Sequence, residues 1–268
     1  MRLCCQDSLV PGRSLEERLD RLESWGFEGV ETSINEQNAE RVKEVFAGRS
    51  VKPSVVGVPV LALFTSPDRK VREETFEVTK RYLEIAEEVG VVGAAMVPEL
   101  SRPPLPDLTP YKSKMELEFE LFCVYLKQVD DYARKCGVYI ILENVNRYEI
   151  PFFNRLEQIT EVAKRVGCTN TGILADTFHM NIEESNIEGA LAQAAGYVKH
   201  VHLVDSNRML PGYGHTDFLP ILRVLKDAGY TGFMSFEGTV PGDPEVTIPA
   251  AAERVRQWMA RLEEGGRG

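Results

Sequence analysis

The chain has 268 residues, of which 43% are hydrophobic, and this length and composition suit one large α/β domain. Its formal net charge is −10 and its pI is about 5.1, so a nucleic-acid-binding surface is not expected. The amino-terminal stretch lacks the apolar core of a secretory signal, and no run of about 18 apolar residues could cross a membrane. We therefore expect a cytoplasmic protein without a membrane partner. Five cysteines without metal-type spacing fit reduced thiols.

Strand-like and helix-like stretches alternate along the chain. The first expected strand, 2–5, is followed by a helix that begins after Ser14 and ends at Gly26. The later strands are expected at 27–32, 52–60, 91–100, 139–143, 172–176, 198–204 and 232–237. The later helices are expected at 37–47, 68–90, 115–136, 154–166, 186–195, 217–228 and 246–263. The proline-rich segment 101–110 is expected to form a loop over the mouth of the fold.

Regular alternation of this kind indicates a parallel sheet with right-handed crossovers. Eight strand and helix units favour a closed (β/α)8 TIM barrel over a doubly wound sheet, and the chain has no GxGxxG motif after its first strand. No linker or change of composition interrupts the pattern. The prediction is one α/β domain covering residues 1–268.

Four consecutive expected strands, from the fifth to the last, end in a side chain that can bind a cation. These side chains are Glu143, Asp176, His202 and Glu237, at intervals of 33, 26 and 35 residues, each about one β/α unit. The carboxyl ends of barrel strands meet at one face, so three carboxylates and one imidazole would converge there. They would repel one another unless a divalent cation lay between them, and such an oxygen-rich set suits Mn²⁺, Mg²⁺ or Co²⁺. The alternative is that each is an ordinary polar residue at a strand end.

The second half of the chain also carries a family resemblance. Over roughly residues 67–240 it resembles ketose 3-epimerases of the D-tagatose 3-epimerase type, within the xylose-isomerase-like TIM-barrel superfamily. The segments that carry the resemblance are ENVNRYE at 143–149, ADTFHMNIEE at 175–184, HVHLVDSNRMLPGYGH at 200–215 and FEG at 236–238. The segments LCCQDSLVPG and VGVPVLALF of the first half do not match the family residue by residue, so the sugar is not named by the sequence.

The resemblance implies an isomerase that inverts C3 of a free ketose through an enediolate stabilised by one divalent metal ion per chain, with Mn²⁺ as the first choice. It implies that Glu143, Asp176, His202 and Glu237 hold the metal, and that Glu143 and Glu237 are also the two catalytic bases. It implies three substrate-binding residues, namely Glu149, His179 and Arg208. It further implies a sugar substrate and a homo-oligomer, either a dimer or a tetramer.

Simpler roles and other reactions remain open at this stage. His179 could cap a helix, Arg208 could be a solvated loop cation, and Glu149 could pair with Arg147 or Arg155. Glu31, near the end of the second expected strand, is interpreted as a solvated group at the rim. An aldose–ketose or hydroxypyruvate-type isomerase, or a keto-inositol dehydratase, could use the same metal site. A three-zinc endonuclease would need more histidines than the four present, and a non-catalytic sensor would not need two catalytic carboxylates.

Overall fold

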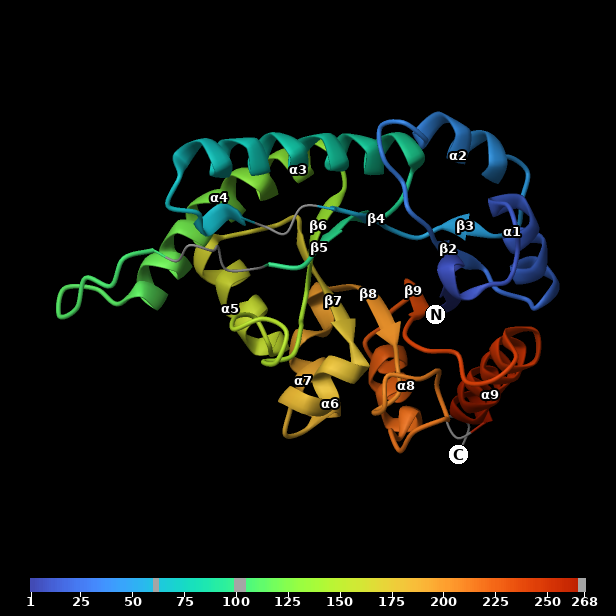
Figure 1. Ribbon diagram of the computed structural model, residues 1–268. Coiled ribbons are helices and arrows are strands. Elements are labelled where there is room, and N and C mark those ends of the chain that lie inside the picture. Colours follow the sequence, from blue (N-terminus) through green and yellow to red (C-terminus); the bar gives the residue numbers. More distant parts are fainter. Residues whose placement is uncertain (60–62, 99–104, 265–268) are drawn as a thin grey trace.

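The computed structural model describes residues 1–59, 63–98 and 105–264. Within these ranges the strands form one all-parallel sheet in the order β3-β2-β1-β9-β8-β7-β6-β5-β4 (Figure 1). The strands are β1 Arg2–Gln6, β2 Gly29–Glu31, β3 Lys52–Pro53, β4 Val56–Gly57, β5 Gly93–Met96, β6 Tyr139–Glu143, β7 Thr171–Asp176, β8 Val198–Leu203 and β9 Phe233–Phe236.

The sheet closes through β3 and β4, which are two parts of the single strand expected at 52–60. Only Ser54 and Val55 separate them. On one side of this run Ser54 N donates to Val30 O at 3.0 Å, and on the other side Val58 N donates to Ala95 O at 2.8 Å. The interrupted run therefore joins β2 to β5. Counted as one strand, it completes the eight-stranded TIM barrel that the sequence predicts.

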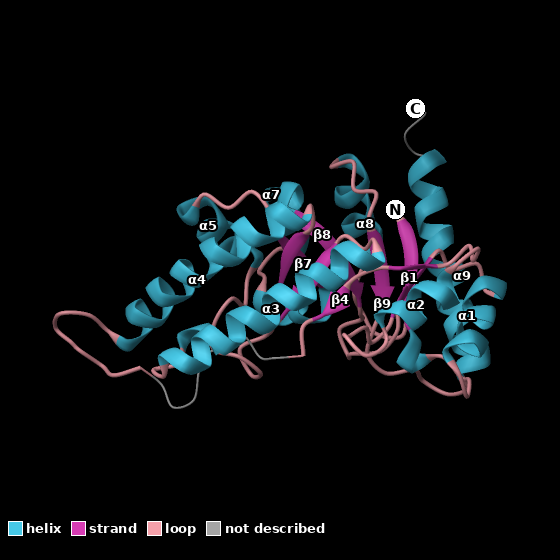
Figure 2. Ribbon diagram, turned by 90° about the horizontal axis from the view of Figure 1, so that it is seen from above, coloured by secondary structure: helices cyan, strands magenta, loops and turns pink. Residues whose placement is uncertain are grey.

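Helices cover the outside of the strands, as Figure 2 shows from above. The helices are α1 Leu15–Ser24, α2 Ala39–Phe46, α3 Arg69–Val89, α4 Lys114–Cys136, α5 Leu156–Val166, α6 Thr177–Glu183, α7 Ile187–Ala194, α8 Phe218–Asp227 and α9 Pro244–Glu264. Three short 3₁₀ helices lie at Asp7–Leu9, Leu63–Thr65 and Ala195–Tyr197. The short helix α6 was not expected from the sequence. No helix of the described ranges is long and apolar enough to cross a membrane.

Local sequence explains the bounds of the long helix α4. Ser113 accepts a hydrogen bond from Glu116 N while Glu116 accepts one from Ser113 N, which is a capping box. At the other end Gly137 adopts φ 69°, a left-handed conformation that costs glycine little. Between these ends Phe122 and Leu126 are buried against the barrel. Residues 105–113 project sideways from the start of this helix (Figures 1 and 2). Of the segment 101–110 that is expected over the mouth, residues 101–104 lie outside the described residues.

The buried apolar side chains form two separate clusters. The main apolar cluster fills the space between strands and helices, whereas a small cluster of Val55, Ile141 and Leu174 is separate from it. Ile141 and Leu174 lie two residues before Glu143 and Asp176, so they share the faces of those side chains and fill the barrel interior below them. Elsewhere in the strands, polar His200 and Ser235 are 0% exposed. These two polar side chains lie two residues before His202 and Glu237, on the same strand faces.

Candidate active site and metal centre

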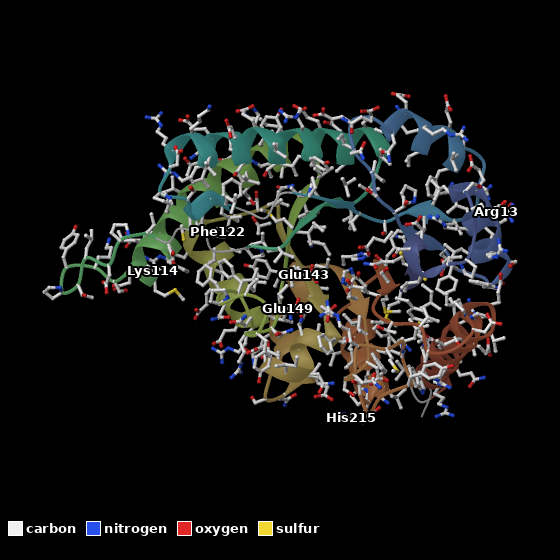
Figure 3. The ribbon with its side chains drawn as sticks, viewed as in Figure 1. Arg13, Lys114, Phe122, Glu143, Glu149 and His215 are labelled. Atoms are coloured by element: carbon white, nitrogen blue, oxygen red, sulfur yellow. The ribbon has the colours of Figure 1, made fainter. Side chains whose placement is uncertain are left out.

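The strand register brings the four predicted cation-binding side chains together. Asp176 and His202 are direct partners in the pairing of β7 with β8. Glu143 is the last residue of β6, and Glu237 follows the last residue of β9. Figure 3 shows Glu143 in the interior of the molecule at the end of its strand.

The four side chains surround the Nδ1 atom of His202. The distances from this nitrogen are 2.7 Å to Glu237 Oε2, 3.4 Å to Asp176 Oδ2 and 3.6 Å to Glu143 Oε1. One potential ligand atom from each residue lies within 4.8 Å of the others. The Nδ1 atom is buried and makes no hydrogen bond of acceptable geometry. A buried nitrogen that faces three carboxylates in this way is in the environment of a metal ligand.

Charged neighbours in the cluster shift the pKa values of Glu143, His202 and Glu237. Burial raises the pKa of Glu143 to about 7, and the carboxylates of Asp176 and Glu237 add to this effect. For Glu237, burial acts in the same direction, but the cationic form of His202 outweighs it and lowers the pKa to about 2. Burial lowers the pKa of His202, yet the carboxylates around it, first Glu31 and Glu237, hold it well above its ordinary value. In the absence of other cations, a proton on His202 therefore balances the carboxylates.

The residues present fit a divalent cation. Three carboxylate oxygens and one imidazole nitrogen form the donor set that Mn²⁺, Co²⁺ and Mg²⁺ accept, and they converge on one point without a bonded partner for Nδ1. A cation placed there would replace the His202 proton and relieve the repulsion between the carboxylates. The second group of potential ligands among the described residues, Glu31 with His200 and His202, shares the same histidine.

Glu31 is not the rim group that the sequence suggested. Its side chain is only 19% exposed, and its Oε2 atom lies 3.1 Å from Nε2 of both His200 and His202. Burial alone would raise its pKa, but the two histidines outweigh burial and hold the pKa well below its ordinary value. When the carboxylate accepts a hydrogen bond from Nε2–H of a neutral ring, the Nδ1 lone pair of His202 is directed at the cluster. Glu31 therefore fixes the imidazole with Nδ1 towards the three carboxylates.

Asp176 also begins the short helix α6. Its Oδ1 atom accepts a hydrogen bond from His179 N at 2.9 Å, while its Oδ2 atom faces His202. The helix turns His179 back towards the loop after β6, where the backbone N–H of Asn146 donates to His179 Nδ1 at 3.2 Å. Burial lowers the pKa of His179, so the neutral ring carries its proton on Nε2 as a hydrogen-bond donor.

Glu149 and Arg208 form an ion pair at the edge of the site. Arg208 Nη1 lies 2.6 Å from Glu149 Oε1, and the same oxygen accepts a hydrogen bond from Asn146 Nδ2 at 3.0 Å. The three predicted substrate-binding residues, Glu149, His179 and Arg208, are thus connected through Asn146, which the sequence analysis did not single out.

The alternative partners of Glu149 are bound to other residues. Arg147 pairs with Glu183, and Arg155 pairs with Glu157. His200, two residues before His202 on the same strand, is buried. His215 lies on the surface away from Glu143, as Figure 3 shows.

TIM-barrel enzymes have their active sites at the carboxyl ends of the strands, and the cluster of potential metal ligands lies at those ends here. The fold and the cluster together are those of the TIM-barrel class of enzymes. Within that class, the model of the family described as xylose isomerase-like TIM barrel matches residues 19–262. The chain belongs to this family, as its sequence motifs predict.

Curated relatives are named as sugar epimerases. D-psicose 3-epimerase of Ruminiclostridium cellulolyticum is 36% identical over 127 residues. This match covers 45% of the present chain and 43% of the length of that protein. The 3-dehydro-D-guloside 4-epimerase of Escherichia coli strain K12 is 27% identical over 267 residues, which cover 95% of this chain and 97% of that protein. The ketose 3-epimerase resemblance is therefore confirmed, and a keto-glycoside epimerase is similar over a longer stretch.

Solved structures share the fold over nearly the whole chain. A structure of the 3-keto-D-glucoside 4-epimerase from E. coli has a TM-score of 0.81 at 25% identity and covers 98% of this chain and 99% of its own. A structure of L-ribulose 3-epimerase has a TM-score of 0.84 at 22% identity, and the match covers 99% of this chain and 96% of that one. The second likeness supports the fold alone.

Proposed function

We propose that this protein is a metal-dependent sugar epimerase that inverts C3 of a free ketose. The observation that carries the proposal is the placement of Glu143 and Glu237, which approach the same His202 nitrogen from β6 and from the end of β9. Inversion beside a carbonyl needs one group to remove the carbon-bound proton and another to deliver a proton to the opposite face. Two carboxyl groups that reach a shared position from different strands could take these two roles.

Each proposed residue has one role. Glu143 and Glu237 exchange the proton at C3, one from each face of the sugar. Glu149, His179 and Arg208 hold the oxygens at the C1 and C2 end, where His179 Nε2–H and the guanidinium are hydrogen-bond donors. A divalent cation held by Glu143, Asp176, His202 and Glu237 would supply charge stabilisation for the sugar oxygens next to the reacting carbon. We propose Mn²⁺ for this role, with Co²⁺ or Mg²⁺ as substitutes, because the donor set is rich in oxygen.

A second candidate function follows from the relative that matches nearly the full chain. The 3-dehydro-D-guloside 4-epimerase matches 95% of this chain, whereas the D-psicose 3-epimerase matches 45%. Epimerisation at C4 beside a C3 ketone of a glycoside requires the same two carboxyl groups and differs in the position of the carbonyl. The proposal of a cytoplasmic homo-oligomer applies to both candidates.

Proton exchange in D₂O separates the candidates. Manganese-loaded protein is incubated with tagatose, fructose and psicose, and in parallel with a 3-keto-glycoside, and the deuterium is located by NMR. Deuterium at C3 of a ketose, together with its C3 epimer, is the expected result. Deuterium only at C4 of the keto-glycoside selects the second candidate, and deuterium at C1 indicates an aldose–ketose isomerase. Absence of exchange from all four sugars contradicts the proposal.

Three variants make this experiment specific. Glu143→Gln and Glu237→Gln are each expected to abolish formation of the C3 epimer, because an amide cannot carry the proton on its own face of the sugar and the remaining carboxylate serves only the other face. Glu253→Gln removes an exposed carboxylate on α9 and is expected to retain full exchange. Formation of the C3 epimer by either site variant would show that the protons move through other groups.

A further inference from the structure

The segment that carries Arg208 has little regular structure but is held by one buried side chain. Between β8 and α8 the structure describes every residue and shows no strand or helix, and Met209 forms an isolated bridge with Thr239. Asp205, at the start of the segment, is 0% exposed. Sequence motifs alone indicate no role for this residue. Its surroundings show what it does.

The Asp205 carboxylate accepts four backbone N–H groups from the segment. Its Oδ1 atom accepts from Ser206 at 2.7 Å and Thr216 at 2.9 Å, and its Oδ2 atom accepts from Gly212 and Gly214 at 2.8 Å each. These four donors lie within the eleven residues 206–216. Without the carboxylate, each of the four amides would need water or another acceptor. Burial acts to raise the pKa of Asp205, but the four amides outweigh it and keep the group ionised.

The glycines of the segment make this arrangement possible. A Cβ atom on Gly214 would lie 2.3 Å from Asp205 Oδ1, and Gly212 has φ 88°, which other residues rarely adopt. The PGYG sequence thus lets two amides approach the same oxygen. No other side chain type combines two acceptor oxygens with this short reach.

Backbone contacts connect the same segment to Arg208 and to the loop after Glu237. Arg208 N donates to Asp205 O at 2.8 Å, and Arg208 O accepts from Thr239 N at 2.8 Å. Arg208 itself has φ 61°, an unfavourable conformation for a residue with a side chain. It persists because these contacts fix it from both sides.

We propose that Asp205 is a positioning residue that holds segment 206–216 in its binding conformation before a sugar arrives, so that Arg208 is already beside Glu149. The part of this inference that concerns sugar binding rests on the proposed function. The part that concerns the conformation of the segment does not.

The test compares Asp205→Asn with the matched control Asp217→Asn in the metal-loaded protein. Asp217 ends the same segment, is exposed, and accepts a hydrogen bond from Leu219 N to begin α8. Hydrogen–deuterium exchange without sugar is measured on peptides from 205–217. Asp205→Asn is expected to accelerate amide exchange by about tenfold or more, because an amide group turns a donor towards two N–H groups. Asp217→Asn is expected to leave exchange at 206–216 unchanged, and equal exchange in Asp205→Asn and wild type would overturn the proposal.

Two further measurements separate positioning from general stability. With the ketose that the wild type epimerises, Asp205→Asn is expected to lower kcat/KM mainly through a higher KM, while its Mn²⁺ affinity stays within about twofold of wild type. Faster loop exchange with unchanged kcat/KM would refute the positioning of Arg208. If the wild type moves no ketose proton, the proposed function fails and the exchange experiment alone decides the role of Asp205. If Asp205→Asn does not fold, Gly214→Ala disturbs the same carboxylate from the amide side and takes its place.

Discussion

Substitution of Glu31 by Gln tests how the site prepares His202 for a metal ion. The Oε2 atom of Glu31 is 3.1 Å from Nε2 of both His200 and His202, and Oε1 is 3.3 Å from Gln6 Nε2. Gln keeps the shape and one acceptor oxygen but removes the negative charge that holds the two imidazoles. Loss of such a partner behind a metal-bound histidine lowers metal affinity about 10- to 100-fold, or about 1.4–2.7 kcal/mol.

Isothermal titration of metal-free protein with Mn²⁺ measures this change directly, without reference to any sugar. The matched control is Glu28→Gln, because Glu28 lies just before the same strand and its side chain is exposed. We expect the control to bind Mn²⁺ as the wild type does. An affinity of Glu31→Gln within about twofold of wild type would refute the role of Glu31 in orienting His202, since even the lower bound of the expected effect exceeds that difference.

Three further predictions concern pH, backbone conformation and core packing. Burial raises the pKa of Glu143 to about 7, so a cation competes with a proton there. The apparent Mn²⁺ affinity should fall as pH decreases below about 7, by up to about tenfold per pH unit for each proton released, which titrations in matched buffers can measure. Gly238→Ala places a Cβ atom 2.4 Å from Arg208 O at φ 95°, so we expect a loss of at least about 1 kcal/mol of unfolding free energy in denaturant titration, together with weaker sugar binding. Phe122→Ala removes a side chain that is 2% exposed and should lower the unfolding free energy by about 3–5 kcal/mol without changing metal affinity.

The chain offers a matched control for each of the last two substitutions. Gly229, like Gly238, has a positive φ, 72°, but a Cβ atom added there by Gly229→Ala would meet nothing within 4 Å. It should lose stability without loss of sugar binding, and equal binding defects in both variants would contradict the contact argument. Val124 lies on the same helix as Phe122 and is 56% exposed. Val124→Ala should change the unfolding free energy by no more than about 0.5 kcal/mol.

The strands, helices and barrel of this protein can be predicted from its sequence. Strand alternation and the spacing of the β/α units predict both the barrel and the meeting of Glu143, Asp176, His202 and Glu237, because side chains at the ends of parallel strands must lie at one face. The spacing of the repeated units is enough to predict these positions, and no individual contact needs to be known. The role of the four side chains as metal ligands stays a proposal.

Contacts between distant parts of the chain needed the tertiary structure. Glu31 looks like a rim residue along its own strand, yet closure of the barrel brings it to His202, which is 171 residues away. Glu149 has nearby arginines in the sequence but pairs with Arg208 across 59 residues. Asp205 gathers amides whose convergence depends on the path of an irregular segment. Local periodicity determines which residues reach the face of the barrel, whereas the partner of each charge there depends on closure of the sheet and on loop paths, which have no sequence period.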